Sequence, residues 1–533
     1  MADQARVVGV YPSNVTATHA RLLDALSCAL PVSFHPLSDE LAPDAIVILS
    51  GLDAYQSLNL PAVPCLVAVS EGQSTEKLEI TLSKDAALDP RLRGRTLEPE
   101  SAIEVGVIDA TRDDRVFAQS HDGPIWLQRG DGDTAIEITT VPIPELDPDE
   151  VVRDCLSPGR CMALLPLFHF LREVSREIDW KLPPLRASLM IDDPNLHGMS
   201  YGFIGFPSLV DHAETHNYHL SSATIPLDGW YVNRRAAQCF QQHADRVSLL
   251  VHGNNHSRHE LAQDHSEAEC VALAAQALRR ISKLESRSGL RVARVMAAPH
   301  GKCSTQMAAG MARVGFDAMC HSRPFPWIKR LPADVTLAGM APAQWTEEGL
   351  PVLPRFSMEA SETDIALRAF LGQPLIMLGH HWDAVNDYAL FERAAAIANS
   401  LGDVQWMGME AMARSNYSWK RQGDVLYIRP YSKHVVVDVP DGVHAIEVET
   451  PAVGGCSESG VLDVSGTESS TIRENGVLGG TRAEIAGTTC TVRWRHTRAI
   501  DPATVDAPGT PLKHVARRMA TEIRDRMQPI TGR

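Results

Sequence analysis

The chain has 533 residues, which at about 150 residues per domain is enough for three or four domains and excludes a single small module. Hydrophobic residues make up 44% and charged residues 22%, a balance that excludes a wholly disordered protein. The formal charge of −16 repels phosphate backbones, so we expect no nucleic-acid partner. The chain also has 21 histidines, and imidazole both titrates near neutral pH and ligates metals.

The first residues contain no basic segment followed by a long apolar stretch, so the sequence predicts no signal peptide. No run of about 18 uncharged apolar residues occurs, and we therefore expect no transmembrane segment and a cytoplasmic protein. The ten cysteines lack a C-x-x-C pair, which indicates reduced thiols. Cys65 lacks the turn glycines of a nucleophile elbow and is interpreted as a core thiol. Cys303 lacks an assigned base, so we do not expect it to be a nucleophile.

The N-terminal part of the chain, residues 1–150, is predicted to form an α/β layer domain of unknown role. Short apolar runs alternate there with a helical pattern, at residues 6–10, 16–30, 45–50 and 63–69. The domain has neither a G-x-G-x-x-G nor a Walker motif, so it offers no phosphate-binding loop. Prolines and acidic residues at 140–150 mark a linker.

The next part of the chain, residues 151–416, begins with a predicted helix at 161–177 and then alternates strands and helices. Strands are predicted at 187–191, 220–225, 247–251, 292–296, 316–319 and 375–378. Helices are predicted at 266–285, 305–314, 363–371 and 388–401. This alternation predicts a parallel barrel, closed or nearly so, whose chemistry lies at the C-terminal strand ends.

Beyond the barrel, residues 417–497 are predicted to form a small antiparallel β domain. Residues 498–533 form a proline-rich linker and a basic amphipathic helix, with apolar residues at 512, 515, 519, 523 and 527. Such a helix binds a membrane surface, its own protein or a neighbouring subunit. We expect this helix to pack on its own protein or on a neighbouring subunit, and the second alternative would mean self-association.

Acidic and histidine side chains follow the predicted barrel strands. The first strand runs into Asp192 and Asp193, so one carboxylate can hold a metal while the other acts as a base. The third strand ends in His252-Gly-Asn-Asn-His256, and a helix there would place both imidazoles on one face. Asp193, His252 and His256 would leave a fourth position open, as at a catalytic zinc site.

Two further histidine pairs test this interpretation. His212 and His216 have the same spacing but precede a strand within a polar run, so we interpret them as solvated helix positions. The late strand leads into His380-His381-Trp382, which adds imidazole at a third strand end. Together the strand ends favour a metal site. Because residue 253 is Gly, the H-E-x-x-H motif of a metalloprotease is absent.

The order of these motifs, with Ala298-Pro299-His300-Gly301 between them, resembles the polysaccharide deacetylase superfamily over residues 185–415. The resemblance implies a distorted (β/α)7 barrel that removes N- or O-acetyl groups from sugars with zinc or another divalent metal, such as cobalt or nickel. It implies that Asp192 is the general base and that the ligands are Asp193, His252 and His256. The general acid is then His381 or its neighbour His380.

The sequence departs from the family at its third motif, where Ala297 replaces an arginine that normally orients the base, and His300 replaces an aromatic residue. His300 either lines the substrate pocket or is a loop residue bonded to the backbone. Asn195 and Tyr201 lie in a glycine-rich loop suited to a sugar, or to a purely structural role. Trp382 either walls the acetyl pocket or fills the core.

Three hypotheses follow from these residues. The first is a metal-dependent deacetylase acting on a saccharide. The second is a metal-independent glycoside hydrolase on a related barrel, which uses two carboxylates. The third is a non-catalytic saccharide-binding or assembly protein, which the Ala297 substitution makes conceivable.

Overall fold

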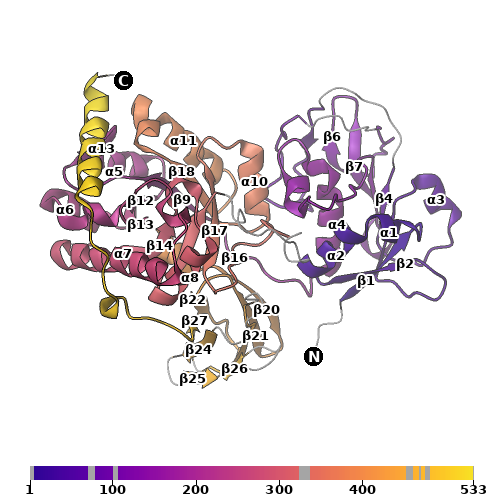
Figure 1. The fold of residues 1–533 in the computed structure, drawn as a ribbon. Helices are drawn as coiled ribbons and strands as arrows, with labels where there is room; N and C mark the ends of the chain where they lie inside the picture. Colours follow the sequence, from indigo (N-terminus) through magenta and orange to yellow (C-terminus); the bar gives the residue numbers. More distant parts are fainter. Residues whose placement is uncertain are drawn as a thin grey trace. The chain divides into compact units, whose positions relative to one another are not determined.

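The computed structural model describes residues 5–69, 78–99, 106–322, 337–451, 460–466, 470–473, 481–485 and 487–531. The chain divides into two compact units (Figure 1). The first unit consists of Met1–Trp180, Arg330–Met340 and Ser361–Leu371, and the second of Lys181–Lys329, Ala341–Ala360 and Gly372–Arg533. None of the helices within the described ranges is long and apolar enough to cross a membrane.

The first unit is built on an eight-stranded mixed sheet in the order β2-β1-β3-β4-β8-β7-β6-β5. The first five strands in this order pair in parallel and the last four pair antiparallel, so β8 belongs to both halves. The strands are β1 (Arg6–Tyr11), β2 (Val32–Pro36), β3 (Ala45–Ile48), β4 (Cys65–Ala68), β5 (Thr81–Leu82), β6 (Arg115–Gln119), β7 (Pro124–Arg129) and β8 (Ile136–Thr139). The helices are α1 (Val15–Thr18), α2 (Ala20–Ala29), α3 (Leu52–Ser57), α4 (Leu165–Ser175) and α10 (Glu362–Phe370).

Seven parallel strands close into a barrel in the second unit, because β12 and β18 both pair with β9. The ring runs β9 (Arg186–Asp192), β12 (Leu220–Thr224), β13 (Val247–His252), β14 (Val292–Ala297), β15 (Ala318–His321), β17 (Pro351–Ser357) and β18 (Leu375–Gly379). Nearly every residue of these strands is buried, since one face lines the barrel interior and the other lies under helices. The predicted parallel barrel is confirmed, and β17 is a strand that the sequence analysis missed.

Helices surround the barrel strands (Figure 1). They are α5 (Phe206–Thr215), α6 (Arg234–Gln242), α7 (Glu267–Ser288), α8 (Thr305–Val314), α11 (Val385–Asn399) and α12 (Met409–Arg414). The longest, α7, begins at a capping box formed by Ser266 and Glu269 and ends at Gly289, whose left-handed backbone suits glycine. Short strands add to the periphery: β10 (Ser200–Tyr201), β11 (Ile204–Gly205), β16 (Gln344–Trp345) and β19 (Gln405–Trp406).

Two four-stranded sheets follow the barrel in the same unit. One contains β20 (Tyr417–Gln422), β21 (Val425–Pro430), β23 (Ala445–Val448) and β26 (Thr481–Glu484), and the other β22 (His434–Asp438), β24 (Gly460–Gly466), β25 (Ser470–Arg473) and β27 (Thr489–His496). Apolar residues from both sheets share one core, among them Ile428 and Val492. Strand pairs are antiparallel as expected, except that β21 and β23 are parallel.

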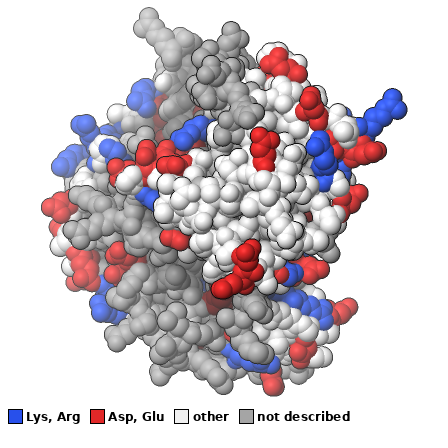
Figure 2. All heavy atoms as spheres, turned by 90° about the vertical axis from the view of Figure 1, so that its right-hand side faces the viewer, with Lys and Arg blue, Asp and Glu red and all other residues white. Residues whose placement is uncertain are grey.

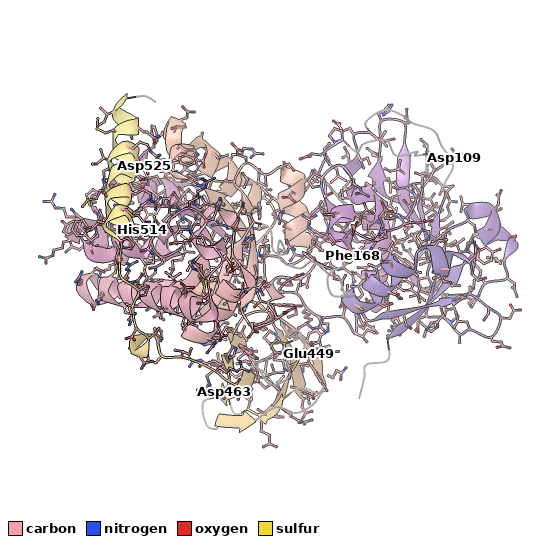
Figure 3. The ribbon with its side chains drawn as sticks, viewed as in Figure 1. Asp109, Phe168, Glu449, Asp463, His514 and Asp525 are labelled. Atoms are coloured by element: carbon pink, nitrogen blue, oxygen red, sulfur yellow. The ribbon has the colours of Figure 1, made fainter. Side chains whose placement is uncertain are left out.

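The second unit ends with helix α13 (Leu512–Thr531), which confirms the predicted C-terminal helix. Figure 3 marks its course by His514 and Asp525. Charged residues of both signs are interspersed with uncharged ones on the face of the protein in Figure 2. No disulfide bond joins the described cysteines, and Cys456 lies outside the described residues.

Candidate metal centre and active site

The predicted strand-end residues gather at one end of the barrel. Strand β9 lies between β12 and β18, with Asp192 opposite Ala223 and Ile191 opposite Gly379. Parallel strands of a barrel present their C-terminal ends on the same side. The residues that follow β9 and β18 therefore leave the barrel next to each other.

Asp193, His252 and His256 form a cluster able to hold a metal ion. The Oδ1 atom of Asp193 lies 3.6 Å from Nε2 of His252 and 3.2 Å from Nε2 of His256. This oxygen is buried and accepts no hydrogen bond from the described residues. A buried carboxylate oxygen that faces two imidazole nitrogens is the environment that a cation completes, and the N,N,O donor set suits zinc. The residues present therefore fit the metal that the sequence predicts.

The loop that carries His256 is not helical, so the helical geometry expected for this pair is wrong. His252 is the last residue of β13, and His256 lies in a loop with φ of 52°. The carboxylate of Glu260 accepts hydrogen bonds of 2.7–2.9 Å from three consecutive backbone N–H groups, those of residues 254–256. A Cβ at Gly253, where φ is +60°, would overlap the Glu260 carboxylate. A buried acid rather than a helical turn thus brings His256 back towards His252.

The protonation states of the cluster are those that bind metal. His252 Nδ1 lies 2.9 Å from the carbonyl oxygen of Ala297, which can only accept, so Nδ1 donates to it and Nε2 is the nitrogen that faces Asp193. Desolvation raises the pKa of Asp193, but the nearby imidazoles and Arg518 outweigh it and lower this pKa to about 2. Burial and the neighbouring His252 lower the pKa of His256 to about 3. Near neutral pH, Asp193 is therefore ionised and His256 is neutral.

Asp192 is held by an arginine that the sequence analysis missed. Nη1 of Arg355 donates to Oδ1 of Asp192 over 3.0 Å, and Nη2 donates to the carbonyl oxygen of Ala298 over 2.9 Å. Asp192 and Arg355 are both buried. The arginine that the third motif lacks at Ala297 is thus replaced by one from β17. Its sequence signal is an arginine inside an otherwise apolar run, Pro-Val-Leu-Pro-Arg-Phe.

His381 is enclosed beside this cluster, whereas His380 is half-buried. The His381 ring packs edge-on against Tyr201 and in parallel with Phe203, and its Nε2 lies 3.8 Å from Oδ2 of Asp525. A Cβ at Gly202, where φ is +51°, would overlap the His381 ring. His380 instead stacks on Trp382, with ring centroids 4.3 Å apart. Of the two candidate acids, His381 is therefore the one held by its surroundings.

The predicted substrate-binding residues divide into two groups. Trp382 is 47% exposed, and His300 is exposed with its ring centroid 5.0 Å from that of His256. Asn195 and Tyr201 are buried and bind α13: Oδ1 of Asn195 accepts from Arg526, and the Tyr201 hydroxyl donates to Asp525. Only Trp382 and His300 are therefore accessible to a ligand.

Helix α13 contacts loops at the end of the barrel where the cluster lies. Arg517 donates to the carbonyl oxygens of Asn255 and His256, and Arg518 forms a buried ion pair with Asp228 at 2.7 Å. Asn255 and His256 follow β13, and Asp228 follows β12. The loop after β9 supplies further partners of the helix. His197 pairs with Glu522 at 2.9 Å, and Arg526 donates to the carbonyl oxygen of Ser200. The helix therefore forms part of the wall of the candidate active site.

The charged face of α13 packs on the barrel and its apolar face is exposed. Arg518 and Asp525 are buried, whereas Met519, Ile523, Met527 and Ile530 are 46–76% exposed. The expected packing on the same chain is found, although the face that packs is the polar one. Long-range ion pairs rather than apolar burial hold this helix.

Solved structures similar to this chain are carbohydrate esterases and polysaccharide deacetylases. They include a family 4 carbohydrate esterase from Streptomyces lividans in complex with acetate, at 13% identity over 41% of this chain and 88% of that chain, with a TM-score of 0.25. The peptidoglycan deacetylase PdaC from Bacillus subtilis is 13% identical over 43% and 91%, with a TM-score of 0.25. A Streptococcus mutans CE4 esterase is 12% identical over 42% and 85%, with a TM-score of 0.26.

No protein-family model and no curated protein matches the sequence. The similar structures come from the family that the sequence motifs resemble.

Proposed function

We propose that this protein is a metal-dependent hydrolase that removes N- or O-linked acetyl groups from a saccharide. The proposal is carried by the metal-binding cluster Asp193, His252 and His256 beside a second buried carboxylate, Asp192, at the C-terminal end of a parallel barrel. The motif order that resembles polysaccharide deacetylases supports the choice of an acetylated saccharide. Zinc is the expected metal, with cobalt or nickel as substitutes.

Asp192 is the proposed general base. A divalent ion held by Asp193, His252 and His256 would polarise the acetyl carbonyl and acidify a water molecule. Arg355 engages Oδ1 of Asp192, which fixes the carboxylate and leaves Oδ2 to accept the proton of the attacking water. Arg355 also supplies the positive charge that a buried carboxylate needs as a partner.

His381 is the proposed general acid, which protonates the leaving amine or alkoxide. Burial lowers the pKa of His381 below its usual value, and the charges of Asp525 and Asp193 offset part of that lowering. Asp525 touches no reacting atom in this scheme and acts as a positioning residue for the imidazole. His380, stacked on the exposed Trp382, is the alternative acid on the open side of the same turn.

The carboxylates favour metal chemistry over glycoside hydrolysis. A glycosidase needs one carboxylic acid with a raised pKa to protonate the leaving group. Here the pKa of Asp193 is lowered, and Asp192 is tied to a buried guanidinium. Neither carboxyl group is therefore suited to act as that acid.

The test is metal analysis combined with acetate release from acetylated oligosaccharides. Wild type is expected to lose turnover on chelation and regain it with zinc. His256→Ala is expected to lose the metal of this cluster together with turnover. His259→Ala removes a nearby histidine outside the cluster and serves as the matched control. Full turnover after chelation, or saccharide binding without acetate release under any metal, would contradict the proposal.

A further inference from the structure

A second group of potential metal ligands lies on the outer helices of the barrel. His212 belongs to α5 and His216 is its C-cap, one helical turn further on, and their rings stack with centroids 4.2 Å apart. Oε1 of Glu392, on α11, lies 3.8 Å from Nδ1 of His216. One ligand atom from each of the three residues lies within 4.8 Å of the others. Among the described residues, this arrangement occurs only here and at the barrel mouth.

We propose that His212, His216 and Glu392 form a second metal site, which takes a divalent transition metal such as zinc. Two imidazoles at positions i and i+4 of a helix present nitrogens on one face, and a carboxylate from a neighbouring helix completes a tridentate set. A tetrahedral zinc ion needs ligand atoms about 3.4 Å apart, which small side-chain rotations provide. The N,N,O donor set selects zinc, cobalt, nickel or copper over calcium and magnesium, which prefer oxygen ligands.

The surroundings of His212 suit a ligand. Its Nδ1 lies 3.0 Å from the hydroxyl oxygen of Tyr218, which can accept the Nδ1 proton and leave Nε2 with a lone pair. Asp387, a further acid on α11, adds negative potential that favours a cation.

The site would join two helices that adjoin the candidate active site. Helix α11 follows the turn His381–Ala384, and α5 follows the loop that contains Gly202. The hydroxyl group of Tyr388, on α11, already bonds the backbone N–H of Gly205 and the hydroxyl of Ser208. A metal ion at this place would strengthen the same connection. Its expected role is therefore structural, and it does not depend on the proposed deacetylase activity.

The experiment counts zinc on metal-stripped full-length protein by isothermal titration and elemental analysis. Wild type is expected to bind two equivalents, and His216→Ala and His256→Ala one each, from different sites. The double variant is expected to bind none. His243→Ala is the matched control, because His243 pairs with Glu214 at 3.3 Å but belongs to neither metal-ligand group. This variant is expected to keep both equivalents.

Thermal unfolding provides a second readout that separates this site from the barrel cluster. At a 100-fold excess of zinc over Kd, zinc is expected to raise the Tm of His256→Ala by about 5 °C. The increase is expected to vanish when His216→Ala is added, and magnesium or calcium is expected to have no effect.

Binding of two equivalents by His216→Ala, or of a single equivalent by wild type that only His256→Ala removes, would overturn the proposal. A chain that binds zinc here but not at the barrel mouth would support it and contradict the proposed function instead.

Discussion

Two histidine pairs with identical spacing have different geometry in this molecule. His212 and His216 are one turn apart on α5, so the helix itself brings their rings together. His252 and His256 are separated by the end of a strand and a loop, and the Glu260 carboxylate closes that loop. The surface pair thus needs only helical hydrogen bonds, whereas the barrel pair depends on buried charged side chains. The predictions below test this difference.

The largest expected effect is that of Asp192→Asn, which removes the proposed base and keeps the ligands. We expect kcat to fall by about 10²–10⁴-fold, because a positioned base contributes about that much. Metal analysis should find the barrel site still occupied, since Asp192 is not a ligand. The partner variant Asp193→Asn should lose both metal and turnover. Equal metal loss in the two variants would show that the adjacent carboxylates do not have separate roles.

Arg355→Met should destabilise the barrel by about 3–5 kcal/mol, because it leaves Asp192 as an unpaired buried carboxylate. Urea unfolding gives the change in free energy. The control is Arg294→Met, which breaks the less buried pair with Glu285 and should cost about 1 kcal/mol or less. Similar losses in both variants would mean that the Asp192–Arg355 pair is no more important than a surface ion pair.

Glu260→Ala should weaken zinc binding at the barrel cluster by about 10–100-fold, because residues that orient ligands typically contribute that much. Zinc affinity at the proposed second metal site should not change, because none of its three ligands contacts Glu260. Competitive titration with a chelator measures the zinc affinities of both sites. Glu269→Ala, which alters the α7 capping box, is the control. Unchanged affinity at the barrel cluster would remove the distinction drawn between the two histidine pairs.

Asp525→Asn should lower kcat by about tenfold with little change in KM, because it removes a charge that orients His381 without touching substrate. Asp525 raises the pKa of His381, so its loss should move the alkaline limb of the pH–rate profile to lower pH. Met519→Ala, on the exposed face of α13, is the control. A profile that keeps its shape would contradict the positioning role.

The smallest expected effect is a pH dependence of α13 docking through His197 and Glu522. Burial lowers the pKa of His197, but the bond with Glu522 outweighs it, so its net pKa is raised above 6.5. This stabilisation is complete below pH 6.5 and is lost as the pH rises through the raised pKa. Desolvation raises the pKa of Glu522, but His197 and Arg526 outweigh it and lower this pKa to about 2. The contribution of Glu522 is therefore present above pH 4.5 and is lost as the pH falls towards 2.

Docking of α13 should accordingly be strongest between pH 4.5 and 6.5. Amide exchange of α13, corrected for intrinsic rates, should show up to about 1 kcal/mol more protection at pH 5.5 than at pH 8.5. Glu522→Gln should abolish this difference. Equal amide-exchange protection of the wild-type helix at the two pH values would contradict the prediction.

Much of the barrel was predictable because its strands are apolar and separated by clear helical patterns. Strand β17 was missed because Pro351, Pro354 and Arg355 interrupt its pattern, and proline within a run argues against an inner strand. The buried arginine that hides this strand is the same one that holds Asp192. The side chain that binds the proposed base thus obscured the signal of the strand.

Only those residues of the candidate site that belong to a local sequence pattern were predictable. Strand ends indicated Asp192, Asp193 and the histidines, because a carboxylate or imidazole after an apolar run is a local pattern. Arg355 and Asp525 were not predictable, since each meets its partner only after the barrel closes or α13 docks. The sequence could not connect His212 and His216 with Glu392 for the same reason, because Glu392 lies on a helix far along the chain.

The polar packing of α13 has a consequence for when the site is completed during synthesis. Tyr201 and Asp525, which share a hydrogen bond, are 324 residues apart in the chain. At about 5–20 residues per second, the ribosome adds residue 525 roughly 7–30 s after His381. During that interval the barrel and its metal ligands exist, while Asp228 still lacks Arg518 and His381 lacks Asp525. A nascent chain would therefore complete the proposed metal cluster before it acquires the carboxylate beside the proposed acid, so synthesis itself would delay the onset of the proposed activity.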